Sequence, residues 1–275
     1  MTAVVAALLV AGDASAQSAA KGKGNSAANV SSAELAGAES GATSAPAGGD
    51  LGKAVADVQA LSDKSPLVQN ILLVTMLAVA PAILVMVTSF TRIVVVLGLL
   101  RQALGSVTLP PNQVLFGLSL LMSVVVMAPT YRSIHSDAIE PYLAGKITPA
   151  QAVTASESHL RGFMIRQIEA GNNRDDVMLF MDEKTAARED LTWREVPTMS
   201  LMPAFVISEL KIAFLIGFQI YLPLLIIDML VSGLLVSMGM LMMPPTMISL
   251  PFKLLLFVLA NGWHLVVGTL IRSFG

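Results

Sequence analysis

The stretch PAFVISELKIAFLIGFQIYLPLLII, from Pro203 to Ile227, decides the fold of this chain. It contains two charged residues, and its apolar character continues through Asp228 into MLVSGLLVSMGM. A transmembrane helix needs about 20 mostly apolar residues, so this run is long enough to cross a bilayer. Three other apolar segments lie at about Leu67–Val87, Gln113–Pro129 and Leu250–Ile271. We therefore predict an all-α protein built of hydrophobic helical hairpins.

The composition is typical of a membrane protein. Of the 275 residues, 55% are hydrophobic and 13% are charged, which is about half the charged fraction of an ordinary soluble domain. The formal charge of −2 gives no reason to expect a nucleic-acid partner. The chain has no cysteine, which excludes disulfides and thiolate metal sites.

No residue pattern predicts an enzyme, a metal site or a cofactor site. The three histidines, His135, His159 and His264, lack the spacing of metal ligands. The sequence contains no H-E-x-x-H, G-x-S-x-G or G-x-x-x-x-G-K-[ST] pattern. We therefore expect no catalytic activity, no metal and no cofactor, and the energy for any transport must come from partners.

The N-terminal part has the pattern of a targeting segment followed by a linker. An apolar core at Ala3–Val10 precedes Ala14-Ser15-Ala16, a small-x-small pattern that predicts a signal peptide over residues 1–16. No Lys or Arg precedes Lys21, so a non-cleaved anchor or an apolar tail without function stays open as an alternative. Residues 17–65 are rich in Ala, Gly and Ser and predict a disordered linker.

The polar stretches indicate a topology. Arg92 and Arg101 lie between the first two apolar segments without an acid, so the positive-inside rule places that stretch in the cytoplasm. Residues 131–200 carry more acids than bases and predict a small polar helical region on the periplasmic side. The alternative is that two arginines are too few for this rule, so that their positions carry no information on the topology. The first apolar helical pair is then residues 66–130, and the C-terminal apolar helices are residues 201–275.

Four charged residues lie in the C-terminal apolar segments, namely Glu209, Lys211, Asp228 and Lys253. A charge at bilayer depth costs a few kcal/mol, so such residues usually face a partner or a water-filled path. Glu209 and Lys211 are about 200° apart around a helix, so they cannot pair with each other. Each needs a partner on another helix or another subunit. The alternative is a solvated face on helices that do not span lipid and that stack inside a protein assembly.

Two small residues mark one face of the longest apolar segment. Ala213 and Gly217 are four residues apart, which places them on the same face of a helix. Such small-xxx-small pairs let two helix backbones approach closely. We expect this face to pack against another helix.

The connection before the last apolar segment is rich in methionine. The stretch SMGMLMMPPT, Ser237–Thr246, has four methionines in six residues before Pro244-Pro245. Methionine side chains are unbranched and adapt to irregular surfaces. By itself the stretch predicts a tight, apolar, proline-terminated turn with ordinary packing.

These residues resemble the FliP/SctR family of type III export-apparatus proteins. The patterns P-A-F-x-x-S-E-L-K and S-L-P-F-K-L carry the resemblance in the C-terminal half. TSFTRIVVVLGLLRQALG followed by PPNQVLFGLSL carries it in the first half, and the whole similarity covers roughly residues 67–272. SFTRI and SLPFKL are closer to the flagellar branch, with the virulence-injectisome branch as the alternative.

The resemblance implies an assembly at the bacterial inner membrane, within the flagellar basal body. Family members form a ring of five copies, joined by one FliR-like subunit and several small FliQ-like hairpin subunits into a helical cone. Unfolded flagellar proteins leave the cytoplasm through this gate, which works with other flagellar export and basal-body proteins. Parts lie on the periplasmic side, and the helices lie largely above the plane of the membrane. The chain would then be a non-enzymatic core subunit of a flagellar export gate.

The resemblance also implies roles for particular residues. The implied subunit contacts are Glu209 and Lys211 of the S-E-L-K motif, with Asp228 and Lys253. The family's gate is a methionine-rich loop before Pro-Pro, and the matching positions are Met240, Leu241, Met242 and Met243. Leu241 departs from the methionine run but keeps the apolar volume. Asn261 stands where the family more often has Asp.

Two other functions stay open. A secondary transporter would use Glu209, Asp228 and Lys253 as a relay, although no inverted repeat is visible. A copper-binding role would use the thioethers, which select Cu(I), although no His or Cys accompanies them.

Overall fold

The computed structural model describes residues 74–75, 78–79, 81–83, 85–106, 110–182, 191–240 and 242–275. The predicted signal peptide, the predicted linker, most of the first apolar segment and Leu241 lie outside these residues. Where the chain is described, it forms helices, turns and bends and no strand, so the predicted all-α class is confirmed. The hairpin arrangement and the cone-like assembly stay predictions.

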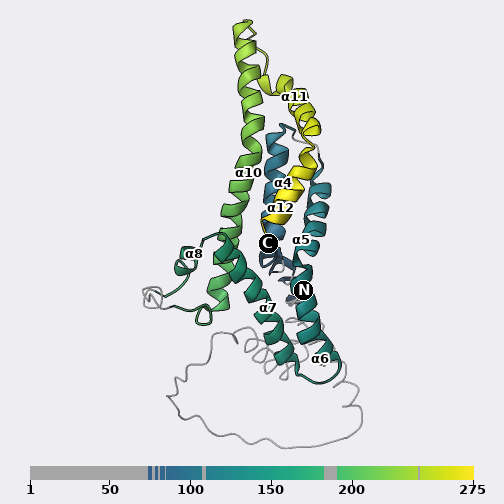
Figure 1. Ribbon diagram of the computed structural model, residues 1–275, viewed down its shortest axis with the longest axis vertical. Helices are drawn as coiled ribbons and strands as arrows, with labels where there is room; N and C mark the ends of the chain where they lie inside the picture. Colours follow the sequence, from purple (N-terminus) through teal and green to yellow (C-terminus); the bar gives the residue numbers. More distant parts are fainter. Residues whose placement is uncertain are drawn as a thin grey trace, which may run out of the picture. The chain divides into compact units, whose positions relative to one another are not determined.

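The helices follow one another along the chain and are labelled in Figure 1. They are α4 (Phe90–Ala103), α5 (Asn112–Ile134), the π-helix η1 (His135–Ile139), α6 (Glu140–Leu143), α7 (Pro149–Ala170), α8 (Asp175–Met178), α10 (Thr198–Ser237), α11 (Pro245–Leu259) and α12 (Gly262–Arg272). The chain forms two compact units. The first contains described residues up to 83 with residues 134–158 and 191–198, and the second contains residues 85–133, 159–182 and 199–275.

The first unit contains η1, α6 and the beginning of α7. A reciprocal capping box begins α7, because the Gln151 backbone N–H donates to Thr148 Oγ1 and the Thr148 N–H donates to Gln151 Oε1. Pro149 follows at the first helical position, where its missing N–H costs nothing. Within the same unit the Thr198 hydroxyl donates to Glu157 Oε1 at 2.5 Å.

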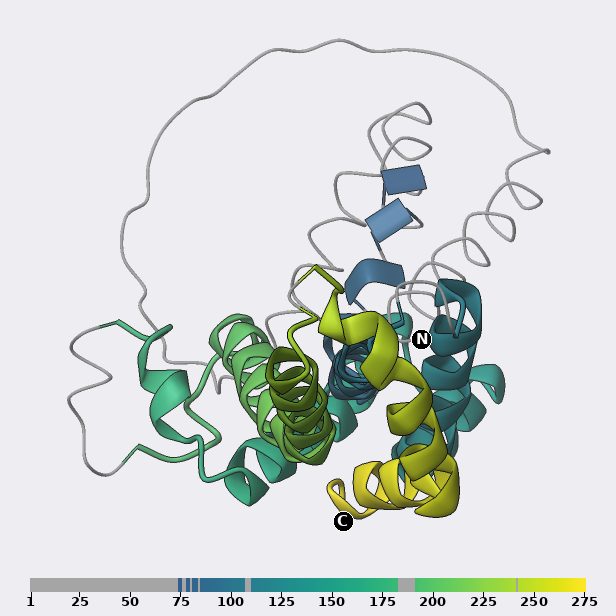
Figure 2. The ribbon, with the colours of Figure 1, turned by 90° about the horizontal axis from the view of Figure 1, so that it is seen from above.

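In the second unit, α4 lies between α10 and α5 (Figure 2). Its first turn meets α5 through a hydrogen bond between the Ser89 and Ser123 hydroxyls, 3.1 Å long, and through edge-on packing of Phe90 against Phe116. Buried apolar residues of α4, α5, α10 and α12 form one core. Its fully enclosed members are Ile93, Val96, Leu97, Ala213 and Leu270.

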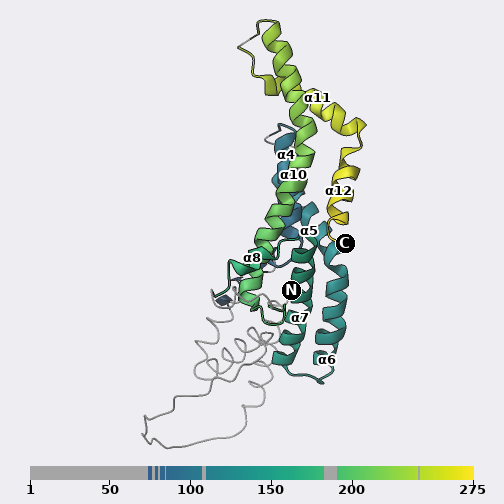
Figure 3. The ribbon, with the colours of Figure 1, turned by 60° about the vertical axis from the view of Figure 1, so that its left-hand side comes forward.

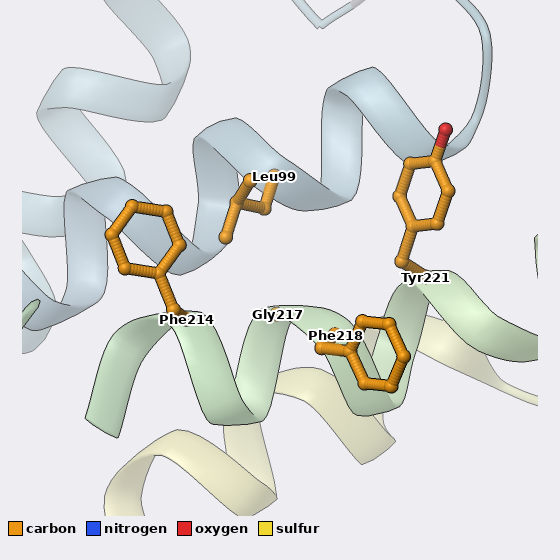
Figure 4. Close-up of a pocket in the computed structure, with 5 residues that line it drawn as sticks. All are labelled: Leu99, Phe214, Gly217, Phe218 and Tyr221. Atoms are coloured by element: carbon orange, nitrogen blue, oxygen red, sulfur yellow. The ribbon is translucent and has the colours of Figure 1, made fainter. Parts of the chain in front are cut away.

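The contact between α4 and α10 is close at Gly217. A Cβ atom built on Gly217 would lie 2.2 Å from Leu99 Cδ1, so a side chain there would overlap the leucine. Ala213, one turn earlier on the same face, is completely buried. The expected packing of this small-residue face is therefore confirmed. Figure 4 shows Leu99 above Gly217, in a shallow apolar hollow that Phe214, Phe218 and Tyr221 also line.

The last apolar segment, predicted as one run, is two helices. α11 and α12 meet at an angle of 65°. Asn261 forms the junction with φ of 50°, in the left-handed region that Asn and Asp adopt more readily than other side chains do. Asn261 therefore fits the backbone conformation that this bend requires.

Within the described residues, two continuous helical stretches are long and apolar enough to cross a membrane. They are Asn112–Leu143, which includes η1 and α6, and Thr198–Ser237, which is α10. The bent pair of α11 and α12 passes the same test when the two helices are taken together. Prolines lie inside α5 and α10 without ending them, as neighbouring packing allows in apolar helices.

Candidate functional site

Arg92 and Glu209 form an ion pair inside the second unit. The Arg92 Nε–H donates to Glu209 Oε2 at 2.8 Å, and Nη2–H donates to Oε1 at 2.6 Å. Both side chains have no exposed surface. A bidentate guanidinium–carboxylate pair fixes the relative orientation of its two helices, here α4 and α10.

The remaining Arg92 donors join two further segments. Nη2 also donates to Gln167 Oε1 on α7, and Nη1 donates to the Ser273 carbonyl at 2.6 Å and to its hydroxyl at 3.0 Å. The guanidinium lies 3.9 Å from the centre of the Phe274 ring, and Gln167 Nε2 donates to the Phe274 carbonyl. We call these five residues the Arg92 cluster. All five guanidinium N–H groups have an acceptor, so the buried charge is fully satisfied.

A second group of residues surrounds Lys253 on α11. Its ammonium donates to Asp228 Oδ2 on α10 at 2.6 Å and to the Ala103 carbonyl at 2.9 Å. Ala103 is the last residue of α4, where a cation complements the helix dipole. The Ser249 hydroxyl donates to the other Asp228 oxygen at 2.6 Å. These four residues, the Lys253 cluster, join α4, α10 and α11.

Lys211 pairs with Asp176 on α8. The Lys211 side chain is 54% exposed and the Asp176 side chain is 5% exposed, so the pair lies at the edge of the unit. Asn173 Nδ2 donates to the Ser208 hydroxyl nearby, at 2.9 Å. These two contacts hold the segment after α7 against α10.

The four charged residues singled out from the sequence therefore have partners within the chain. As expected, Glu209 and Lys211 do not pair with each other, and each bonds to a residue of a different helix. Asp228 and Lys253, for which no partner was predicted within the chain, pair with each other. Their role as contacts between subunits stays a prediction.

The methionine loop, Met238–Pro244, follows the end of α10 farthest from α8 (Figure 3). Gly239 ends the helix with φ of 76°, while its N–H donates to Val236 O and the Met240 N–H donates to Leu235 O. This pattern is a Schellman motif, which satisfies carbonyls of the last turn. Pro244 is extended, and Pro245 begins α11.

The methionines of this loop are exposed in the single chain. The exposed fraction is 97% for Met242 and 71% for Met238, and it is lower for Met243 and Met240. Leu241 belongs to the predicted gate but lies outside the described residues. The predicted gate residues that are described thus form an apolar tip without a charged side chain, and their role as a gate stays a prediction.

Sequence reasoning missed the partners of the buried charges. Arg92 was singled out only as part of a stretch predicted to be cytoplasmic, and that topology stays a prediction; in the structure Arg92 lies in α4 with its charge neutralised by Glu209. One signal could have found it, because an acid inside an apolar segment requires a cation elsewhere and Arg92 stands before the apolar run IVVVLGLL. Gln167, Ser273 and Ser249 carry no comparable signal. Among the described residues, no three His, Asp or Glu side chains are grouped to hold a metal ion.

Comparisons with known proteins agree on one family. The model of the FliP family matches residues 73–270. Flagellar biosynthetic protein FliP of Bacillus subtilis (strain 168) is 46% identical over 210 residues, covering 76% of this chain and 93% of that protein. The protein of the same name from Aquifex aeolicus (strain VF5) is 43% identical, covering 75% of this chain and 85% of its own length. The Caulobacter vibrioides protein is 46% identical, with 75% and 76% covered.

Proposed function

This chain belongs to the FliP family, and we propose that it is a non-enzymatic core subunit of the flagellar type III export gate, which passes unfolded flagellar proteins out of the cytoplasm. The observation that carries this proposal is the family match over residues 73–270. That range includes Arg92, Glu209, the charged pair of the Lys253 cluster and the whole methionine loop. The chain is thus a subunit of the flagellar export apparatus, and the gate role is its proposed place there.

We propose that five copies assemble with FliQ-like and FliR-like subunits into a cone at the bacterial inner membrane. The support is an apolar surface too extensive for a monomer in water. Large exposed side chains run along α10, among them Phe214, Phe218, Met229, Leu230 and Leu234. Lipid or neighbouring subunits must cover this surface, since contact with water costs about 25 cal/mol per Å² of apolar area.

The methionine loop would form the seal of this gate. Around a ring of copies, each loop presents thioethers that change rotamer at little cost and carry no charge that favours an ion. Such a surface can close on itself and also deform around the varied side chains of an unfolded polypeptide. Leu241 adds apolar volume but is branched, so the adaptability of the seal would come from Met240, Met242 and Met243.

The charged residues would hold the scaffold from which the loop projects. The Arg92 cluster and the Lys253 cluster each join α10 to other helices within one subunit. We also propose contacts between subunits at this surface. Lys211 is the best placed for such a contact, because its half-exposed ammonium has donors beyond the one bonded to Asp176.

A secondary transporter is the weaker alternative. A proton relay needs ionisable groups that face water or exchange partners. Glu209 is fully enclosed and bonded by both oxygens to Arg92, and Lys253 is 4% exposed and bonded to Asp228. An injectisome gate is also weaker, because the relatives compared are named flagellar.

The test is a variant in which Met240, Met242 and Met243 are changed to alanine. Cells that assemble the apparatus with this variant should leak small ions, because alanine leaves gaps in the seal, while the amount of assembled complex stays near normal. Met199→Ala is the matched control, since Met199 is an exposed methionine at the other end of α10. An assembled triple variant without added leak would contradict the sealing role.

A further inference from the structure

We propose that the methionine loop is also a site of oxidative modification, at which hydroperoxides convert Met238, Met240, Met242 and Met243 to methionine sulfoxide. The chemistry follows from the exposure of these side chains in the single chain. Its consequence, loss of the seal, rests on the proposed function. The chain would then carry an oxidant-sensitive element at its gate.

The methionines that the structure describes differ widely in exposure. Met242 is 97% exposed and Met238 is 71% exposed, and Met247 and Met229 outside the loop are 75% and 68% exposed, whereas Met127 has no exposed surface and Met164 has 1%. Oxidation of a thioether requires the peroxide oxygen to reach the sulfur, so buried methionines react slowly. Met242, the most exposed methionine that the structure describes, should therefore react first, and Met127 and Met164 provide references inside the same molecule.

Methionine is the only sulfur-containing residue type in this chain. The chain has no cysteine and 16 methionines, so no thiolate competes as the faster sulfur nucleophile. Four of the methionines fall within six residues of Met238–Met243. A local encounter with peroxide can therefore modify several neighbouring side chains.

The reaction is balanced with a hydroperoxide as its co-reactant. A sulfur lone pair attacks one peroxide oxygen, so an S–O bond forms and the O–O bond breaks. The sulfur is oxidised by two electrons, and the peroxide is reduced. With hydrogen peroxide the leaving hydroxide takes up the proton of the transferred oxygen, which gives methionine sulfoxide and water.

Oxidation reverses the property that suits these residues to a seal. A sulfoxide is polar and accepts hydrogen bonds, whereas the thioether is apolar. At the methionine loop the change is multiplied by the number of copies in a ring. Water and ions would then find hydrogen-bonding side chains where the closed gate has apolar ones, and the closed state would become permeable.

The first measurement is the oxidation of each methionine in the assembled complex. Cells are treated with hydrogen peroxide, the complex is purified, and its peptides are analysed by mass spectrometry. The loop peptide should gain oxygen several-fold faster than the peptides of Met127 and Met164. Equal rates for loop and buried methionines would overturn the proposal, whatever the role of the loop in the gate.

The second measurement links oxidation to ion leak. Peroxide should increase the leak of cells with the wild-type apparatus, and a variant with all four loop methionines changed to leucine should resist it, since leucine keeps the apolar volume. If the fourfold variant does not assemble, Met242→Leu alone, at the most exposed position, is measured instead and should lower the peroxide-induced leak. Met199→Leu is the control and should stay sensitive.

The two measurements also separate this inference from the proposed function. Rapid oxidation of the loop without any leak, in cells where the alanine variant leaks, would overturn the consequence assigned to oxidation. Rapid oxidation of the loop, with no added leak either from peroxide or from the alanine variant, would instead contradict the sealing role.

Discussion

The two ends of α10 differ. Its first third carries Glu209, a buried carboxylate that accepts two hydrogen bonds from Arg92. Its last turn leads into a loop whose methionines are exposed in the single chain. The buried end depends on directional bonds that few other side chains could make. The exposed end depends on backbone geometry at Gly239 and on apolar, flexible side chains. Substitutions at the two ends should therefore differ in their readout, with folding affected at one and permeability at the other.

The comparison also shows why one helix can combine these properties. Each ion pair is neutral as a whole, so α10 is fixed to α4, α8 and α11 without an uncompensated charge on its apolar surface. The last of these ion pairs along α10 is at Asp228, and Val231 and Leu235 beyond it are still buried. The methionine loop thus follows a helix that is packed almost to its end.

The largest effect is expected for Arg92→Met. Removal of the guanidinium leaves the Glu209 carboxylate buried without a cation, which costs about 3–5 kcal/mol. It also leaves Gln167 Oε1 and the Ser273 carbonyl without their donor. The free energy of unfolding in detergent should fall by that amount, or the chain should fail to accumulate in the membrane.

Two further variants sharpen this prediction. Arg101→Met, in the same helix, should change stability little, because Arg101 bonds to Asn112 at an exposed position. Arg92→Met combined with Glu209→Leu should recover part of the loss, since an apolar pair can replace a buried ion pair. A double variant as unstable as Arg92→Met alone would show that the packing around the cluster, not the unpaired charge, sets the cost.

The sequence predicted the elements of this comparison better than their pairing. Long apolar runs fixed the helical class, and the rarity of charges made Glu209, Lys211, Asp228 and Lys253 conspicuous. Partner choice depends on how helices far apart in the chain pack, and Arg92 and Glu209 are separated by 117 residues. The bend at Asn261 was also missed, because hydropathy is continuous across it while the backbone is not. The predicted gate residues come from the family resemblance alone, since a methionine-rich composition does not show which methionine side chains are exposed.

The second effect in size is expected for Lys253→Met. The change removes one charged hydrogen bond to Asp228 and one to the Ala103 carbonyl, and bonds to charged groups contribute about 1.5–3 kcal/mol each. Asp228 keeps its bond to Ser249 and is partly exposed, so we expect a total loss at the lower end of this sum, about 3 kcal/mol. Thermal unfolding of the purified chain measures it.

Lys146→Met is the matched control, because Lys146 is an exposed lysine of the first unit. It should leave the unfolding midpoint unchanged. If Lys253→Met spares the single chain but abolishes the large complex on a native gel, Lys253 acts between subunits and the intramolecular role is wrong.

A smaller effect is expected for Gly217→Ala, at the close approach of α4 and α10. The added methyl group would lie 2.2 Å from Leu99 Cδ1, so the leucine must move, at a cost of about 1–3 kcal/mol. Gly233→Ala in the same helix is the control. No atom lies within 4 Å of its added Cβ, and alanine favours a helix by about 1 kcal/mol over glycine. Opposite signs for the two variants in an unfolding measurement would support the packing; equal signs would contradict it.

The smallest effect on stability is expected for Gly239→Ala, at the exposed end of α10. A Cβ atom in the left-handed conformation costs about 1–2 kcal/mol, although no atom lies within 4 Å to obstruct it. The last turn can unwind to relieve this strain, so the unfolding midpoint should fall by a few degrees at most while the loop changes direction.

The direction of the loop can be measured by crosslinking. Because the chain has no cysteine, the Met240→Cys variant has a single thiol, and disulfide formation between copies reports the position of the loop. Gly239→Ala should lower that crosslinking in the assembled complex, whereas Gly98→Ala, which meets no atom within 4 Å inside α4, should not. Crosslinking that stays unchanged would mean that neighbouring subunits, and not the Schellman turn at Gly239, direct the methionine loop.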